Sequence, residues 1–210
     1  MYTIYHMKKQ TDSYQILKLV ARYGLISARD VEAAGLHTQA LTRLMRAGKL
    51  ERVAPGLYQL PDPEYKLTEH RGLILASAAA PSGVICLLSA LQFHGIGTQL
   101  PRQVWMALPR KTRAPAIEYP PLRVVRFSGE AFTAGIEEYT LEGQTVRVYD
   151  VAKTVVDCFK FRNKIGMDVA LEALNEGWRE GRFRLVDVEK YARICRVWNV
   201  MRPYLEAIVA

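Results

Sequence analysis

Five polar residues between positions 38 and 46 have the types and spacing expected of a surface that reads DNA bases. They are Thr38, Gln39, Thr42, Arg43 and Arg46. At about 100° of rotation per residue, a helix over 38–47 places them on one face and turns Leu41, Leu44 and Met45 to the other. Arginine can pair with guanine O6 and N7, glutamine with adenine, and threonine with a phosphate or a thymine methyl group. The segment therefore predicts a DNA-recognition helix.

An ordinary surface helix is the alternative, because any amphipathic helix has a polar face. Two features around the helix favour DNA. No Asp or Glu, which would repel phosphates, occurs from Leu36 to Leu50. In addition, Lys49 at the following turn and Arg52 just beyond it could reach the DNA backbone.

The elements around this helix have the order of a winged helix-turn-helix. Asp12 and Gln15 resemble a capping box that opens a first helix, which Gly24 ends. Ser27-Ala-Arg-Asp30 is a second cap signature. After the third helix, two short apolar runs are separated by Ala54-Pro55-Gly56, which predicts a hairpin. We therefore expect residues 1–62 to form a winged helix-turn-helix domain.

Residues 63–210 are expected to form a larger second domain, because Pro61-Asp62-Pro63 interrupts regular structure. Strands are predicted over residues 103–108, 122–127, 137–141 and 144–149. Helices are predicted over residues 67–80, 84–94, 151–164, 167–179, 187–195 and 199–209. Runs of helices, strands and then helices favour an α+β domain with a short mixed or antiparallel sheet and flanking helices.

Composition and charge narrow the class of partner. The chain has 210 residues and a net charge of +8, which favours nucleic acid first and an anionic membrane surface second. No charged residue occurs between Arg71 and Arg102, but Pro81-Ser82-Gly83 cuts this run into pieces too short to span a membrane. The three cysteines lie far apart and the first residues lack a signal-peptide pattern, so we expect a cytoplasmic protein.

No known catalytic or metal-binding motif is present. The sequence contains no P-loop, dinucleotide-binding, zinc-protease or nucleophile-elbow pattern. Its four histidines are too scattered to propose a metal site, and His94 is interpreted as a capping or core residue. The acid pairs Asp30/Glu32 and Asp187/Glu189 fall where helices should begin, where acids favour the helix dipole. We therefore expect no enzyme, catalytic residue, metal or cofactor.

Four segments carry a resemblance to a known family. In the N-terminal part they are Gly24-Leu-Ile-Ser-Ala-Arg-Asp-Val31 and Leu41-Thr-Arg-Leu-Met-Arg-Ala-Gly-Lys-Leu-Glu-Arg-Val-Ala-Pro-Gly-Leu-Tyr58. Downstream they are Leu88-Ser-Ala-Leu-Gln-Phe-His-Gly95 and Val148-Tyr-Asp-Val-Ala-Lys-Thr-Val-Val-Asp157. These segments resemble the AbiEi-type antitoxins of bacterial abortive-infection, type IV toxin–antitoxin systems. One departure is Lys153, where arginine is expected; lysine keeps the charge but loses bidentate pairing.

The resemblance implies two roles in phage defence. The winged helix would bind inverted repeats in its own promoter and repress transcription, and the C-terminal domain would counteract a nucleotidyltransferase-like toxin without a stable complex. We expect a monomer in solution. One rival hypothesis is a protein-interaction module that binds a cytosolic partner directly. Another is a nucleic-acid-modifying enzyme. Loss of activity when Asp150 and Asp157 are removed together, in a protein that still folds, would support that hypothesis.

Three lysines on the predicted helix over 151–164 are a second candidate site. Lys153, Lys160 and Lys164 fall on one stripe with Asp157, while the apolar residues face elsewhere. A solvated face, in which Asp157 pairs with its lysines, is one interpretation. The other is a stripe that contacts an anion: operator phosphates, or an RNA or nucleotide connected with the toxin.

Overall fold

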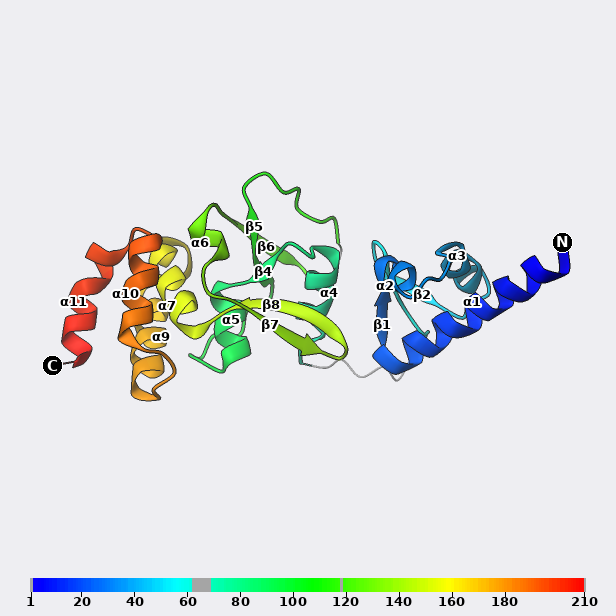
Figure 1. Cartoon of the computed structure of the whole chain (residues 1–210). Coiled ribbons are helices and arrows are strands. Elements are labelled where there is room, and N and C mark those ends of the chain that lie inside the picture. Colours follow the sequence, from blue (N-terminus) through cyan, green and yellow to red (C-terminus); the bar gives the residue numbers. More distant parts are fainter. Residues whose placement is uncertain (1, 62–68, 118, 210) are drawn as a thin grey trace. The chain divides into compact units, whose positions relative to one another are not determined.

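The computed structural model describes residues 2–61, 69–117 and 119–209, with side chains from residue 12 onward (Figure 1). Its internal contacts divide the chain into two units. Unit 1 comprises Met1–Pro81, Pro115–Pro120 and Thr140–Thr145, and unit 2 comprises Ser82–Ala114, Pro121–Tyr139 and Val146–Ala210. Asp62 and Pro63, at the predicted domain boundary, lie outside the described residues.

Unit 1 contains the predicted order of three helices and a hairpin. Its elements are α1 (Tyr2–Tyr23), β1 (Leu25–Ser27), α2 (Ala28–Ala33), α3 (Gln39–Arg46), β2 (Glu51–Ala54), β3 (Leu57–Gln59) and α4 (Arg71–Ala79). The strands form an antiparallel sheet in the order β1-β3-β2. Strand β1 was missing from the sequence prediction, because three residues are too few to show an alternating pattern. The α3 residues Leu41 and Leu44 pack with Ile16 and Val20 of α1 in one core.

The prediction that Asp12 caps the first helix is wrong. Helix α1 begins at Tyr2, so Asp12 lies in its interior, where it is buried. The cause is visible in the sequence: residues 2–11 contain neither Gly nor Pro, and nothing in them stops the helix from extending toward the N-terminus.

Unit 2 is an α+β assembly, as the sequence predicts, although the ends of β7 and β8 that join at their turn, Thr140–Thr145, are grouped with unit 1. Its elements are β4 (Val84–Ile85), α5 (Leu87–His94), β5 (Val104–Pro109), β6 (Leu122–Phe127), α6 (Glu130–Thr133), β7 (Ile136–Leu141), β8 (Gln144–Tyr149), α7 (Val151–Lys160), α8 (Arg162–Ile165), α9 (Met167–Arg179), α10 (Leu185–Ile194) and α11 (Trp198–Val209). The sheet order is β6-β5-β4-β8-β7. Strand β4 pairs antiparallel with β5 and parallel with β8, so the sheet is mixed.

Two predicted helices of unit 2 differ from the structure. The segment 84–94 begins with a two-residue strand, β4, at the centre of the sheet, and only then forms α5. The predicted helix over 151–164 ends at Lys160, and Lys164 belongs to the separate short helix α8. Within the described residues, none of the helices is both long and apolar enough to cross a membrane.

Candidate nucleic-acid interface

Helix α3 has the two faces that its sequence predicts. Ala40, Leu41 and Leu44 are buried, and Leu41 is only 2% exposed. The polar side chains point away from this core: Gln39, Thr42, Arg43 and Arg46 are exposed, and Thr38, directly before the helix, is half-buried. The hydrophobic core of unit 1 thus fixes α3 from one side and leaves its polar face to solvent.

Local hydrogen bonds position the elements on either side of this face. Ser27 caps α2: its hydroxyl accepts a bond from the Asp30 backbone N–H at 3.1 Å, and the Asp30 carboxylate accepts one from the Ser27 N–H at 2.6 Å. After α3, Lys49 and Arg52 are exposed in the turn and in β2. The Arg52 Nε donates to the carbonyl oxygen of Ala54 at 3.3 Å. Unit 1 therefore places one polar helix face and two basic residues on a compact scaffold.

A comparison with protein families covers the segment that forms this scaffold. Residues 14–61 match the family described as "Transcriptional regulator, AbiEi antitoxin". This segment therefore resembles the corresponding part of AbiEi-type antitoxin regulators. It runs from the middle of α1 through β3, so it contains the whole predicted recognition helix and the hairpin. The resemblance that the sequence shows is confirmed for its N-terminal segments, whereas the segments 88–95 and 148–157 lie outside the matched residues.

A solved structure resembles the chain over a longer stretch than the AbiEi match. The crystal structure of the RV2827C protein from Mycobacterium tuberculosis matches with a TM-score of 0.57 and 16% sequence identity, over 87% of this chain and 71% of that one. At this identity the likeness concerns the fold alone. No curated protein matches the chain.

The predicted lysine stripe is wrong at Lys153. Its side chain and that of Asp157 are both fully buried, and the Lys153 Nζ lies 2.5 Å from the Asp157 Oδ2. The stripe was predicted as a solvent-facing one, but eight of the ten residues of α7 are buried, since α5, α9 and α10 pack around it. Lys153 therefore cannot contact an external anion, whereas Lys160 is half-buried and Lys164 is exposed.

The structure places Lys160 and Lys164 near the end of the edge strand β6. The Lys160 Nζ lies 5.1 Å from the ring centroid of Phe127, the last residue of β6, and Lys164 lies over Phe161, which packs on Phe127. The Arg126 guanidinium donates to the carbonyl oxygens of Pro109 and Thr112 in the β5–β6 loop. We use the name β6 basic edge for the exposed or half-buried cations of β6, of the β5–β6 loop and of the ends of α7 and α8 near Phe127: Arg110, Lys111, Arg113, Arg123, Arg126, Lys160 and Lys164.

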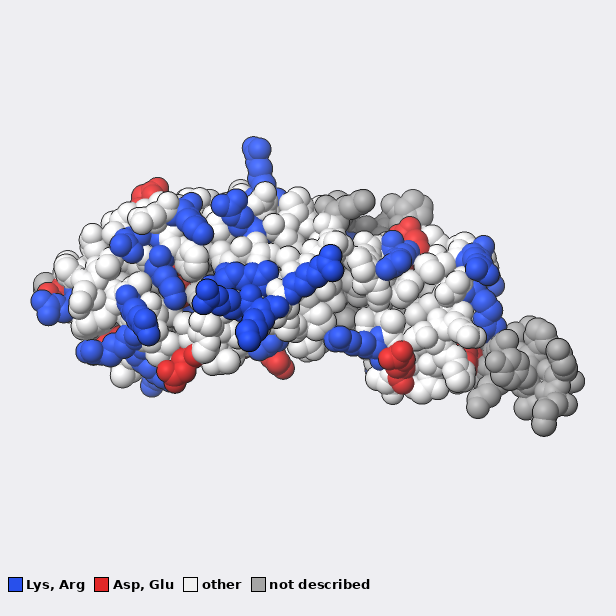
Figure 2. Space-filling model, turned by 90° about the horizontal axis from the view of Figure 1, so that it is seen from above, with Lys and Arg blue, Asp and Glu red and all other residues white. Residues whose placement is uncertain are grey.

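Figure 2 looks down on the side of unit 2 where the β5–β6 loop lies and shows Lys and Arg side chains gathered there. The sequence analysis did not single out the five residues between 110 and 126. A signal was present: residues 102–129 contain six Lys or Arg and a single acid, Glu118. The structure adds that α7 brings Lys160 onto Phe127 of this strand and α8 brings Lys164 onto the neighbouring Phe161.

The acidic and histidine candidates have structural partners. Asp30 belongs to the α2 capping box, and Asp187 in the first turn of α10 accepts bonds from Arg184 at 2.7 and 3.0 Å. The His94 ring donates through Nε2 to the carbonyl oxygen of Tyr149 at 2.7 Å. Among the residues that the structure describes, no group of three or more His, Cys, Asp or Glu side chains is placed to hold a metal ion.

Proposed function

We propose that this protein is a DNA-binding autorepressor and antitoxin of a type IV toxin–antitoxin system. The observation that carries the proposal is the exposed polar face of α3, set on the segment that matches AbiEi-type antitoxin regulators. In a winged helix-turn-helix the recognition helix enters the major groove, where Arg43 and Arg46 can pair with guanine and Gln39 with adenine. Lys49 and Arg52 then contact the flanking phosphates.

In this proposal the DNA site consists of inverted repeats in the protein's own promoter. Unit 2 counteracts a nucleotidyltransferase-like toxin without forming a stable complex with it. The protein acts in the cytoplasm, as a monomer before it meets DNA, and requires neither catalysis nor a cofactor. The protein takes part in abortive infection, by which a bacterial population defends itself against phage.

The β6 basic edge replaces the lysine stripe as the site in unit 2 that contacts an anion. Seven cations on one strand, its loop and two helix ends form the electrostatic footprint that a phosphate backbone requires. Two candidate anions remain: operator phosphates beside the winged-helix site, and an RNA or nucleotide connected with the toxin.

The proposal is tested by titrating the full chain into fluorescent promoter DNA and into a scrambled duplex of equal length. We expect tighter binding to the promoter and a steep fall of affinity with salt, because phosphate contacts release counterions. A protein-interaction module would bind neither duplex and would hold its protein partner with little salt dependence. Equal, weak binding to both duplexes would contradict the autorepressor.

Toxin neutralisation is better tested in the full chain than in a fragment. Helix α4 lies beyond the predicted boundary, yet the Arg71 side chain donates to Gln59 in the hairpin, and both side chains are buried. A fragment starting at residue 64 would lose this contact. We therefore expect full-length variants of α3 to lose repression while they still protect cells from the toxin. Loss of both functions together would mean that the winged helix also serves neutralisation.

A further inference from the structure

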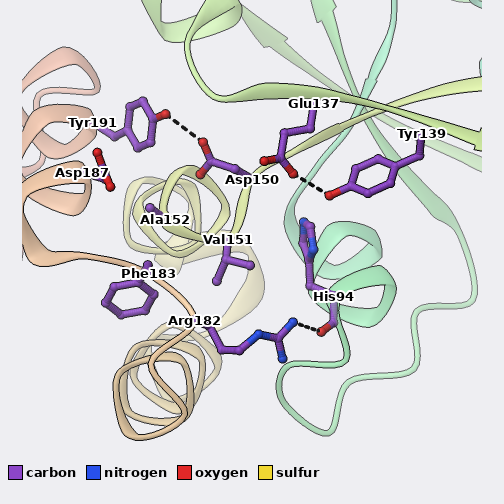
Figure 3. A pocket seen from close by; sticks show the side chains of 10 residues that line it. All are labelled: His94, Glu137, Tyr139, Asp150, Val151, Ala152, Arg182, Phe183, Asp187 and Tyr191. Atoms are coloured by element: carbon purple, nitrogen blue, oxygen red, sulfur yellow. Dashed lines mark hydrogen bonds between the residues drawn. The ribbon is translucent and has the colours of Figure 1, made fainter.

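A cavity of about 430 Å³ lies within unit 2 and is separate from both candidate anion sites. Ten residues from distant parts of the chain line it: His94, Glu137, Tyr139, Asp150, Val151, Ala152, Arg182, Phe183, Asp187 and Tyr191. Figure 3 shows Asp150 and Glu137 on one side, His94 facing them and Arg182 beyond it. The residues come from α5, β7, the start of α7, the α9–α10 loop and α10.

Two carboxylates in this cavity, those of Asp150 and Glu137, accept hydrogen bonds from neutral donors. Asp150 accepts bonds from the backbone N–H of Lys153 and from the Tyr191 hydroxyl, both at 2.7 Å. Glu137 accepts one from the Tyr139 hydroxyl at 2.5 Å. No Lys or Arg side chain in the described part of the chain forms an ion pair with either carboxylate. The pKa of Asp150 is raised, first by burial and also by the negative charge of Glu137.

The other charged groups of the cavity are already engaged. Asp187 is bound by the side chain of Arg184. Arg182 donates to the carbonyl oxygen of His94 at 2.8 Å and lies 3.6 Å from Glu180. Burial lowers the pKa of His94, so its ring is neutral at pH 7. A neutral imidazole that donates through Nε2 keeps Nδ1 as an acceptor. Arg182 retains N–H donors, but Glu180 balances its positive charge. Among the described residues, the carboxylates of Glu137 and Asp150 have no such counter-ion, and His94 adds a neutral acceptor.

The walls and the size of the cavity suit an organic cation. Phe183, Tyr139 and Tyr191 present aromatic rings, and aromatic rings attract ammonium and guanidinium groups. A cavity of about 430 Å³ is in the range that holds small organic molecules. Such a ligand carries several N–H donors, which match the free acceptors, and its charge relieves the repulsion between the carboxylates.

We propose that this cavity binds the ammonium or guanidinium group of an organic cation, with Glu137 and Asp150 as its counter-ions. The cation is either a free amine or the end of a Lys or Arg side chain of a partner protein. The proposal is independent of DNA binding, because none of the residues involved belongs to α3 or to the β6 basic edge.

Calorimetric titration of the full chain at low salt tests the site. The probes are putrescine and agmatine as free cations, the capped amino acids N-acetyl-lysine and N-acetyl-arginine methylamide as side-chain mimics, and 1,4-butanediol as a neutral analogue of putrescine. We expect saturable binding of at least one cation and none of the diol. Binding of the free amines alone assigns a small-molecule ligand, whereas tighter binding of the capped amino acids assigns a protein side chain.

Two neighbouring glutamates provide a matched pair of variants. Glu137→Gln removes a charge from the cavity and should weaken cation binding about 10- to 100-fold, since a hydrogen bond to a charged group is lost. Glu138→Gln removes the same charge from the next residue of β7, which instead lies 3.9 Å from Arg147, and should leave binding unchanged. Both residues are exposed, so both variants should fold. Equal binding by Glu137→Gln and the parent, or no binding of any cation, would overturn the proposal.

Discussion

Lys153 and Asp157 form an ion pair one helical turn apart in the core of unit 2. The Lys153 Nζ lies 2.5 Å from the Asp157 Oδ2, and neither side chain is exposed. The rings of Tyr149 and Phe127 flank the ammonium group, at 4.1 and 4.8 Å to their centroids. The second oxygen of Asp157 accepts a weak bond from the Cys195 thiol at 3.6 Å. Lys153 and Asp157 thus neutralise each other inside the core, and Lys160 and Lys164 alone of the predicted stripe can meet an external anion.

Removing one charge of this pair should lower the free energy of unfolding more than replacing both charged residues with apolar ones. Lys153→Met leaves a buried carboxylate without its cation, and we expect the free energy of unfolding to fall by about 3–5 kcal/mol. Combining it with Asp157→Leu removes both charges and should recover most of the loss, because the desolvation cost disappears. Urea denaturation of the two variants measures this. A double variant no more stable than the single one would contradict the account.

Protonation of His94 should destabilise the fold. Its pKa is lowered, mainly by burial, so the unfolded chain takes up a proton more readily than the folded one. The contribution of His94 to stability is therefore complete above the ordinary pKa of 6.5 and is lost as the pH falls below that value. His94→Gln keeps a donor for the Tyr149 carbonyl and should flatten this dependence. Urea denaturation at pH 7 and pH 5 compares the two proteins, and an unchanged pH dependence in the variant would assign it to another group.

The capping box of α2 should be a measurable part of the stability of unit 1. Ser27→Ala removes the acceptor for the Asp30 N–H and should lower the free energy of unfolding by about 1 kcal/mol. Thr38→Ala is the matched control, since the described structure shows no cap hydrogen bond from the Thr38 side chain. If both variants lose the same stability in thermal unfolding, the capping box is not the cause.

The β6 basic edge should contribute to the salt dependence of operator binding if it contacts DNA phosphates. Changing Lys111, Lys160 and Lys164 together to Gln should then lower the salt slope by up to ~3. The control removes three exposed cations elsewhere in unit 2, at Arg179, Lys190 and Arg202, and should leave the slope unchanged. An unchanged slope with lost protection from the toxin would assign the edge to neutralisation. If repression and protection both survive, the edge serves neither.

The sequence predicts α3 well because one face of this helix meets a core and the other meets solvent. The apolar spacing of Leu41 and Leu44 then identifies the buried side directly. Helix α7 breaks this rule, since helices surround it and two of its charged residues, Lys153 and Asp157, are buried as a pair. The sequence pattern of this helix cannot show that Lys153 lies in the core of unit 2, because its burial depends on residues as distant in the sequence as Phe127 and Cys195.

The cavity of unit 2 is beyond a sequence-based prediction for a related reason. Its polar residues extend from His94 to Tyr191, and no two of them form a recognisable motif. Asp150 is the N-cap of α7. Only the packing of β7 and α10 against the start of α7 brings Glu137 and Tyr191 beside it. Strand β4 was missed because two residues carry no periodicity, although it occupies the centre of the sheet.

Operator binding by Arg43→Ala and Arg46→Ala is the most direct measurement of the central claim, that the polar face of α3 reads DNA. At fixed salt, Arg43→Ala should cost about 1–3 kcal/mol on the promoter and reduce the preference over a scrambled duplex. Arg52→Ala should weaken binding to both duplexes alike, and Arg179→Ala, which removes the same charge from α9, should change neither. If Arg43→Ala and Arg46→Ala both bind the promoter as tightly and as selectively as the parent, α3 is not the reading helix and the account is wrong.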